Sequence, residues 1–152
     1  MSKLSDELSD EIDARDYERI VQIERDNYSG DFKFWKDGIE KKWSFDDDDF
    51  VWFVERKCGE VVAYALLDKE RSDFLYLNDL GVSPKHARQG HATNILRRLV
   101  EWSANYGKKV VLKVAANNEP ARTLYKTFRF KETQFPYMYL PEDHVFMHLT
   151  HS

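Results

Sequence analysis

A glycine-containing turn between a strand-like segment and an amphipathic helix is the feature that most limits the folds open to this chain. The turn consists of Arg88, Gln89, Gly90, His91, Ala92 and Thr93, and it follows an apolar run, residues 74–82, that is typical of a strand. From Ala92 onward, apolar residues recur at the spacing of one helix face. The first N–H groups of a helix have no partner within the helix, and the dipole is positive at that end. This arrangement predicts a site for a phosphate group.

Two common phosphate-binding sequences do not match this turn. The chain contains no Gly-x-x-x-x-Gly-Lys-Ser/Thr string, and the turn holds one glycine where a dinucleotide-binding fingerprint needs three. Nucleoside triphosphates and nicotinamide cofactors are therefore disfavoured as ligands.

Two separate motifs resemble those of the GNAT superfamily of acyl-CoA N-acyltransferases. Leu80-Gly81-Val82-Ser83-Pro84 followed by Ala87-Arg88-Gln89-Gly90-His91-Ala92 is similar to a hydrophobic-x-Val-x-Pro strand end and an Arg/Gln-x-x-Gly-x-Gly/Ala loop. Residues 118–130, Asn-Glu-Pro-Ala-Arg-Thr-Leu-Tyr-Lys-Thr-Phe-Arg-Phe, resemble the later motif Asn-x-x-Ala-x-x-Leu-Tyr-x-x-x-Gly-Phe. The two motifs occur in the family order, with a strand-like segment, residues 110–114, between them.

The chain departs from the family pattern at two positions. Ala87 stands where Arg or Gln is usual, so one side chain that helps to hold the loop or the pyrophosphate is missing, and neighbouring Arg88 is a possible substitute. Arg129 stands where glycine usually closes a helix, so we expect that turn to be built in another way.

The resemblance implies an α/β (α+β) fold: a mixed, mostly antiparallel twisted sheet of about six to seven strands, flanked by helices on both faces. We expect one domain over residues 1–152. The pattern predicts helices over residues 17–28, 34–43, from Ala92 to Gly107 and from Pro120 onward, with Asp13 and Asp16 in an N-cap arrangement. Strands are predicted over residues 50–56, 61–67, 74–82, 110–114, 130–139 and 144–149, with a turn at Cys58-Gly59-Glu60.

Composition excludes several classes of partner. A net charge of −4 and a pI near 5.7 argue against a nucleic-acid binder and suit a cationic substrate weakly. No apolar run approaches the ~20 residues that cross a bilayer, and the acidic start of the chain is unlike a signal peptide, so we expect no membrane partner and a cytoplasmic location. The single cysteine, Cys58, precludes an intramolecular disulfide.

The resemblance implies which residues hold acetyl-CoA, the expected cosubstrate. Its pantetheine arm would pair with Leu80, Gly81 and Val82, the Val82 N–H would face the thioester oxygen, and Gly81 would permit close approach. Ala87 and the turn from Arg88 to Thr93 would hold the pyrophosphate. Asn118, Ala121 and Tyr125 would complete the site, with Tyr125 as general acid toward the departing thiolate.

Asp79 is the candidate general base. It lies in Tyr76-Leu77-Asn78-Asp79-Leu80, which resembles a Tyr-Leu-Glu-Asp-Leu phrase of family members that act on polyamines and aminoglycosides. The alternative is a carboxylate that only anchors the strand. Glu24 is a weaker candidate for which a solvated helix face is the favoured interpretation. His144 and His148 fall in a strand pattern without a third ligand, so no metal site is expected.

We therefore expect an acetyl-CoA-dependent N-acetyltransferase that acts on a primary amine, by direct transfer in a ternary complex. A small cationic amine is favoured as the acceptor. A peptide N-terminus is the alternative, because Tyr137 to Leu149 resembles ribosomal-protein N-terminal acetyltransferases, although Lys113 stands where those enzymes commonly have glutamate. A non-catalytic acyl-CoA-binding module is a third possibility, motivated by Ala87 and Arg129. A homodimer is possible by analogy with the family.

Overall fold

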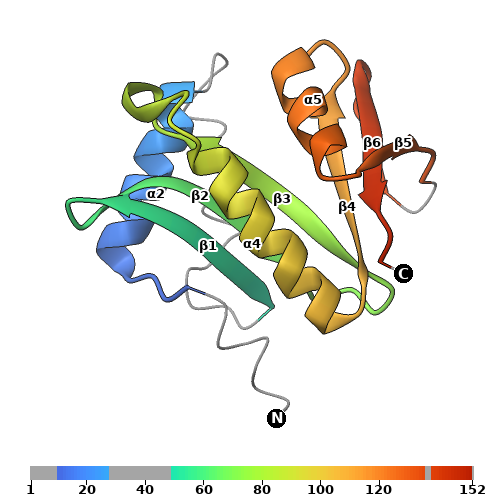
Figure 1. The fold of residues 1–152 in the computed structure, drawn as a ribbon, viewed down its shortest axis with the longest axis horizontal. Helices are drawn as coiled ribbons and strands as arrows, with labels where there is room; N and C mark the ends of the chain where they lie inside the picture. The colour runs from blue at the N-terminus through green and yellow to red at the C-terminus, as the bar shows by residue number, and fades with distance from the viewer. Residues whose placement is uncertain (1–9, 28–48, 136–137, 152) are drawn as a thin grey trace.

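The computed structural model describes residues 10–27, 49–135 and 138–151, so the predicted helix over 34–43 lies outside the described part. Along the chain these residues form α2 (Ala14–Asn27), β1 (Phe50–Lys57), β2 (Glu60–Asp68), β3 (Phe74–Val82), the 3-10 helix η1 (Pro84–His86), α4 (His91–Tyr106), β4 (Lys109–Ala115), α5 (Glu119–Thr127), β5 (Lys131–Thr133) and β6 (His144–Leu149). Figure 1 shows their arrangement.

The six strands of the described residues form one sheet in the order β1-β2-β3-β4-β6-β5. All neighbouring strands are antiparallel except β3 and β4, which are parallel. The β1–β2 hairpin closes through two residues with positive φ, Cys58 (53°) and Gly59 (80°), as predicted for that turn. The predicted mixed, mostly antiparallel sheet is confirmed.

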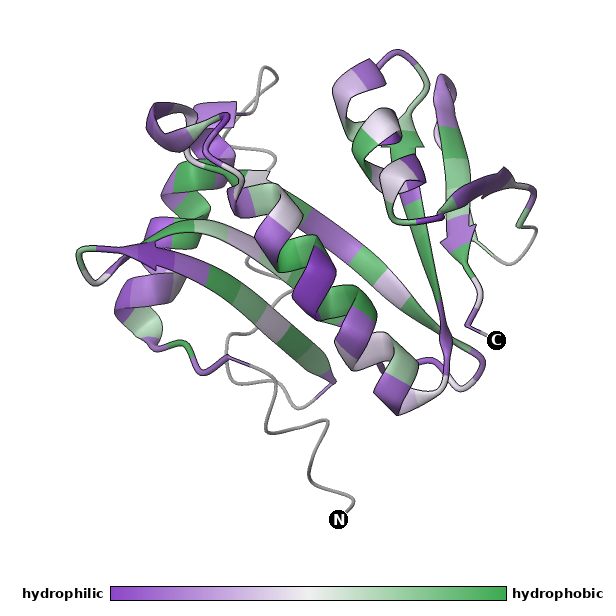
Figure 2. Cartoon of the chain, in the orientation of Figure 1, coloured by the Kyte–Doolittle hydropathy of each residue, from purple (hydrophilic) through white to green (hydrophobic). Residues whose placement is uncertain are grey.

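Helices cover both faces of this sheet, as predicted. Side chains alternate between the two faces along each strand, so each face presents apolar side chains to a helix. On one face, Ile20 and Ile23 of α2 pack on Trp52, Tyr64 and Leu66. On the other face, α4 and α5 bury one larger cluster that includes Leu96, Trp102 and Tyr125. Hydrophobic residues gather on the strands and alternate with hydrophilic ones along α4, whereas the turn before α4 is mostly hydrophilic (Figure 2).

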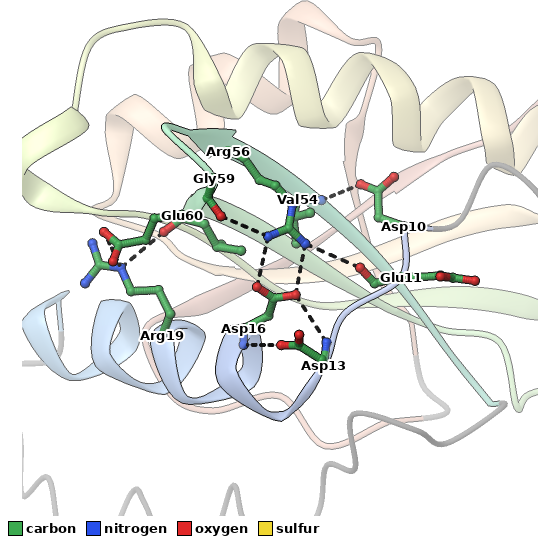
Figure 3. Close-up of polar contacts among 10 residues, drawn as sticks. Asp10, Glu11, Asp13, Asp16, Arg19, Val54, Arg56, Gly59 and Glu60 are labelled. Carbon is green, nitrogen blue, oxygen red and sulfur yellow. Dashed lines mark hydrogen bonds and ion pairs between the residues drawn. The ribbon is translucent and has the colours of Figure 1, made fainter.

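The start of α2 is fixed by a reciprocal pair of hydrogen bonds. The Asp13 carboxylate accepts from the Asp16 N–H at 2.8 Å, and the Asp16 carboxylate accepts from the Asp13 N–H at 3.2 Å. Arg56 of β1 donates to both oxygens of Asp16, at 2.9 Å each, which ties the helix to the β1–β2 hairpin (Figure 3). The predicted N-cap arrangement is confirmed, and it also joins two elements.

The predicted strand over 130–139 is wrong in length, since among the residues of that range that the structure describes only Lys131–Thr133 pairs with β6. The aromatic pattern that prompted the prediction has another cause. Phe135 is buried against the rings of Phe74 and Phe146, at centroid distances of 4.8 and 5.6 Å, without belonging to a strand. The aromatic residues of this range therefore reflect burial in the core and not pairing in a strand.

The expectation that Arg129 requires a different helix ending is also wrong. Arg129 adopts φ 72°, the left-handed conformation that glycine usually supplies. The Phe130 N–H donates to the Tyr125 carbonyl at 3.1 Å, and the Arg129 N–H donates to the Lys126 carbonyl at 2.9 Å. These are the two bonds of a Schellman ending, so the usual turn forms with an arginine in the strained position.

Candidate active site

The sheet opens between its two parallel strands. β3 and β4 pair only through Phe74–Tyr76 and Lys109–Val111, after which the strands diverge (Figure 1). Beyond those pairs, the facing edges of residues 78–82 and 112–115 are not paired with each other; we call these two edges the strand split. Unpaired strand edges can accept an extended ligand as an additional strand.

Backbone groups of β3 are directed into the strand split. The Ser83 N–H donates to the Val62 carbonyl of β2 at 2.8 Å, so strand alternation turns the backbone groups of Val82 the other way. Consistent with this direction, the Val82 carbonyl accepts from Asn27 of α2 at 2.9 Å. The Leu80 N–H is held by the side chain of Asp79 at 2.8 Å. At this end of β3, the Val82 N–H is therefore the donor that points into the strand split and is not held by the Asp79 side chain.

A β-bulge in β3 decides where Asp79 points. Leu66 of β2 pairs with Asp79 while the next residue, Leu67, pairs with Leu77, so Asn78 is the extra residue. Leu77 belongs to the core beneath α4. Without the bulge Asp79 would share that face, but with it the Asp79 side chain lies on the face covered by α2. The carboxylate consequently meets Tyr64 and Glu24.

Asp79, Tyr64 and Glu24 form a hydrogen-bonded chain. The Tyr64 hydroxyl lies 2.5 Å from Asp79 Oδ2 and also bonds to Glu24 Oε1. Burial raises the pKa of both carboxyls, and the charge of Asp79 raises that of Glu24 further. The interpretation of Glu24 as a solvated helix residue is therefore wrong. The sequence offered no signal for the contact, which joins residues 40 positions apart.

Gly81 makes room for this chain of contacts. A Cβ atom built on Gly81 would lie 2.8 Å from Tyr64 Cε1 and 3.0 Å from Glu24 Oε1. The atoms that approach Gly81 most closely are those of the protein's own tyrosine and glutamate, and close approach of the pantetheine arm stays a prediction. A side chain here would displace the Tyr64 ring, which is completely buried.

The predicted phosphate turn has two residues with positive φ, Arg88 at 64° and Gly90 at 85°. Gly90 is the N-cap of α4, and no side chain of the described residues caps that end. Ala87 to Gly90 are exposed, whereas His91, Ala92 and Thr93 are half-buried in the first turn of α4. The N–H groups at the start of this 16-residue helix are therefore placed to bind an anion.

Glu55 of β1 steadies this helix start, a role that sequence reasoning missed. Its carboxylate lies 3.1 Å from His91 Nδ1 and accepts from the Asn94 amide at 3.2 Å. Lys57, two residues further along β1, donates to the Gln89 side chain at 3.3 Å. These contacts give a reason for histidine in the turn: it joins the start of α4 to the neighbouring strand.

The second motif forms α5 beside the strand split. The Asn118 side chain caps the helix by accepting from the Ala121 N–H at 3.3 Å, and Ala121 packs against the core. Tyr125 is 8% exposed, and its ring lies 5.6 Å from that of Phe130. Burial, and secondarily the charge of Asp79, raise the pKa of Tyr125. The two residues thus lie within electrostatic reach of each other, although they belong to opposite faces of the sheet.

The open sheet and the uncapped helix start suit an extended ligand that ends in an anionic group. Residues 17–130 match the family model for the acetyltransferase (GNAT) family, and the chain belongs to that family. A search of curated proteins found no sequence relative of this chain.

Solved structures of this fold include three informative neighbours. The ribosomal-protein-S18-alanine N-acetyltransferase of Escherichia coli has a TM-score of 0.73 at 22% identity, over 92% of this chain and 90% of that one. The PaiA N-acetyltransferase of Thermoplasma acidophilum, solved with coenzyme A, has a TM-score of 0.74 at 14% identity, over 93% and 97%. Arabidopsis thaliana NAA60, solved with a bisubstrate analogue, has a TM-score of 0.64 at 22% identity, over 92% and 95%. At these identities the likeness establishes the fold.

Among the helices in the described ranges, none combines the length and the apolar character needed to span a bilayer.

Proposed function

We propose that this protein transfers an acetyl group from acetyl-CoA to a primary amine, by direct attack within a ternary complex. The observation that carries the proposal is the strand split, with Asp79 on the sheet face covered by α2 and Tyr125 in the core on the opposite face. An amine can then approach from the α2 side and the thioester from the α4 and α5 side.

The acyl donor has a complementary surface on this chain. The N–H groups at the start of α4 would hold the pyrophosphate, with Arg88 and Lys57 as nearby cations. The pantetheine arm would lie along the unpaired edge of β3. The Val82 N–H would then donate to the thioester oxygen, where negative charge develops during attack. Family neighbours solved with coenzyme A support this donor.

Proton transfer is divided between the two faces. Asp79 would take a proton from the acceptor ammonium, so that the neutral amine can attack the carbonyl carbon. Tyr125, whose pKa is raised above that of an ordinary phenol, holds its proton at neutral pH and would donate it to the departing thiolate. Direct transfer needs no covalent enzyme intermediate, and Cys58, which is exposed at the hairpin tip, belongs to neither motif.

A small cationic amine is the acceptor that these contacts favour. The half-buried residues Glu24 and Asp79 form an anionic end to the acceptor side, which attracts an ammonium group. A peptide N-terminus also presents an ammonium group, and the E. coli neighbour is an N-acetyltransferase of an alanine of ribosomal protein S18. Both kinds of acceptor therefore present the same ammonium group. Turnover with a panel of acceptors is needed to distinguish them.

Coenzyme A release should be measured with acetyl-CoA and a panel of polyamines, aminoglycosides and short peptides. We expect turnover with small amines and weaker turnover with peptides. Preference for peptides would change the acceptor class while keeping the reaction. Thermal stabilisation by acetyl-CoA without turnover on any acceptor would instead indicate an acyl-CoA-binding module.

A further inference from the structure

The Tyr64 hydroxyl lies between two carboxyl groups from different elements, Asp79 of β3 and Glu24 of α2. Tyr64 itself belongs to β2, is completely buried, and packs beside Trp52 with ring centroids 6.3 Å apart. Gly81 leaves the space that the Tyr64 ring and the Glu24 oxygen occupy. Three strands and one helix thus hold the phenol oxygen in contact with both carboxyls.

Counting hydrogen atoms shows what this contact requires. A phenol carries a single hydrogen and can donate it to one carboxylate at a time. The second carboxyl can be hydrogen-bonded to the same phenol oxygen only if it is protonated and donates. The three groups together therefore hold two hydrogens and one negative charge. Burial of both carboxyls, which raises their pKa values, agrees with this count.

We propose that Tyr64 is a positioning residue for the acceptor step, because its hydroxyl lets Asp79 and Glu24 share one proton and passes protons from one to the other. This inference rests on the proposed acetyl transfer and adds a route by which the amine proton leaves. In the resting state Glu24 carries the shared proton and Asp79 is charged, since Asp79 also accepts from the Leu80 N–H.

Each proton is accounted for in this route. The acceptor N–H bond breaks and an O–H bond forms on Asp79, so that both carboxyls are briefly protonated. Glu24, which is half-buried, then releases its proton to water. Asp79 gives its proton to the Tyr64 oxygen as the Tyr64 hydrogen moves to Glu24. Tyr64 stays neutral overall, and the pair returns to its resting state with one proton expelled.

Other ionisable groups near the pair do not compete for this proton. Tyr76 of β3 and Tyr125 of α5 both have pKa values raised by burial and by the charge of Asp79, so both remain phenols at neutral pH. Lys113 of β4 lies 5.8 Å from the Tyr76 ring, and Arg19 of α2 contacts Ser83.

The first test is Tyr64→Phe, which keeps the ring and removes the hydroxyl. We expect kcat to fall by about tenfold or more, with acetyl-CoA affinity unchanged. Without the Tyr64 hydroxyl as a donor, the charged form of Asp79 is less stable and the pKa of Asp79 rises. The acid limb of the kcat/KM profile should therefore move to higher pH by about one unit. Tyr106→Phe, which removes a hydroxyl at the far end of α4, is the matched control and should change neither quantity.

Glu24→Gln provides a second test in case Tyr64→Phe fails to fold. Glutamine fills the same space but cannot carry the shared proton or a charge. We expect a similar loss of rate, with the acid limb moving to higher pH because the protonated Glu24 carboxyl hydrogen-bonds to Asp79 and so lowers the pKa of Asp79 in the wild-type protein. Upward shifts in both variants, with the loss of rate, would support the proton relay. Rates within twofold of wild type and unshifted profiles would overturn it.

The shared proton can also be measured without any acetyl acceptor. The carboxyl carbons of Glu24 and Asp79 should titrate together by ¹³C NMR in the wild-type protein, each reporting both steps, and this coupling should weaken in Tyr64→Phe. Two independent titrations near the ordinary carboxyl range would overturn the inference even if acetyl transfer is confirmed. Absence of turnover on every amine, with the coupled titration intact, would instead overturn the proposed function alone.

Discussion

Tyr125 is the residue whose environment most clearly matches one chemical task. Its side chain is buried, the charge of Asp79 lies within reach, and both effects raise its pKa. Such a phenol stays protonated throughout the physiological range, and it is a hydrogen-bond donor for a departing thiolate rather than a base.

We predict that Tyr125→Phe lowers kcat by about 10²-fold and leaves acetyl-CoA affinity nearly unchanged. Because the pKa of Tyr125 is raised, the deficit should be constant between about pH 6 and 9. Steady-state rates across that range, with calorimetric titration of acetyl-CoA, provide the check. An unaltered rate would remove Tyr125 from the acid role, and Tyr106→Phe serves again as the control.

Gly81→Ala tests the space beneath the Tyr64 ring. The added methyl would lie 2.8 Å from Tyr64 Cε1, and a completely buried ring has little room to yield. We expect a loss of about 1–3 kcal/mol in the free energy of unfolding, together with reduced turnover. Denaturant titration and rate measurements would show both.

Gly59→Ala is the contrasting variant. An added methyl at Gly59 meets nothing within 4 Å, but φ is 80° there, so the cost is backbone strain at the hairpin. It should lower stability by about 1 kcal/mol and leave turnover intact. If Gly81→Ala behaved like Gly59→Ala, with stability reduced and turnover kept, the spacing at Gly81 would not matter for the site.

At the level of elements, α2 depends on the link between its first turn and the β1–β2 hairpin. We predict that Asp16→Asn lowers the free energy of unfolding by about 1–2 kcal/mol, since it weakens both the cap and the two-fold bond from Arg56. Asp13→Asn is the control, because asparagine caps helices about as well as aspartate. Urea unfolding of the three proteins gives the comparison.

The same link has a definite dependence on pH. Arg56 lowers the pKa of Asp16, so the folded protein binds this proton less tightly than the unfolded chain does. The stabilisation is complete above the unfolded value of about 4, and it is lost as the pH falls through the lower folded value. The deficit of Asp16→Asn should therefore disappear under acid conditions. A deficit that stays constant down to about pH 2 would show that the charge is not responsible.

The end of α5 gives a stabilising prediction. Arg129 occupies a left-handed position that costs an arginine about 1 kcal/mol relative to glycine, and the ring of Phe130 behind it is already buried. Arg129→Gly should raise the free energy of unfolding by about that amount without changing turnover. Gly107→Ala, at the left-handed end of α4, should lower it by a similar amount. Equal stabilities of Arg129→Gly and wild type would contradict this account.

Elements that depend on neighbouring residues could be predicted from the sequence, and contacts across the sheet could not. The Gly90 turn, the α2 cap and the Asn118 cap are local, so residue type and spacing were sufficient. The orientation of Asp79 depends on a bulge at Asn78 that appears only when β3 pairs with β2. The prediction that Glu24 lies on a solvated helix face was wrong because its partner, Tyr64, belongs to β2, far away in the sequence.

For the whole molecule, the junction between β3 and β4 is the narrowest connection in the sheet. Only Phe74–Tyr76 and Lys109–Val111 pair across it, while β2 and β3 pair along most of their length. An acyl-CoA arm laid along β3 would add backbone hydrogen bonds at this place. Ligand binding should therefore rigidify the centre of the molecule more than its outer strands.

We predict that acetyl-CoA slows amide hydrogen exchange at Val82, whose N–H is directed into the strand split. The free energy of opening for exchange at Val82 should increase by the stabilisation that the ligand provides. This is about 2.7 kcal/mol when the acetyl-CoA concentration is 100 times its Kd. The Leu75 amide, in the paired part of the strand, is the reference and should gain less. Equal protection at both amides would mean that the ligand stabilises the fold without entering the split.

The narrow β3–β4 junction also bears on how the chain is made. The strands on its first side, β1, β2 and β3, are consecutive hairpin neighbours, and α4 packs on them before β4 begins. Everything on its second side comes later in the sequence. During synthesis β1, β2 and β3 can pair with one another while the later part of the chain is still in the ribosome. Few of their backbone hydrogen bonds are made to the later strands. The opening used for the substrates would then also be the boundary between two stages of folding.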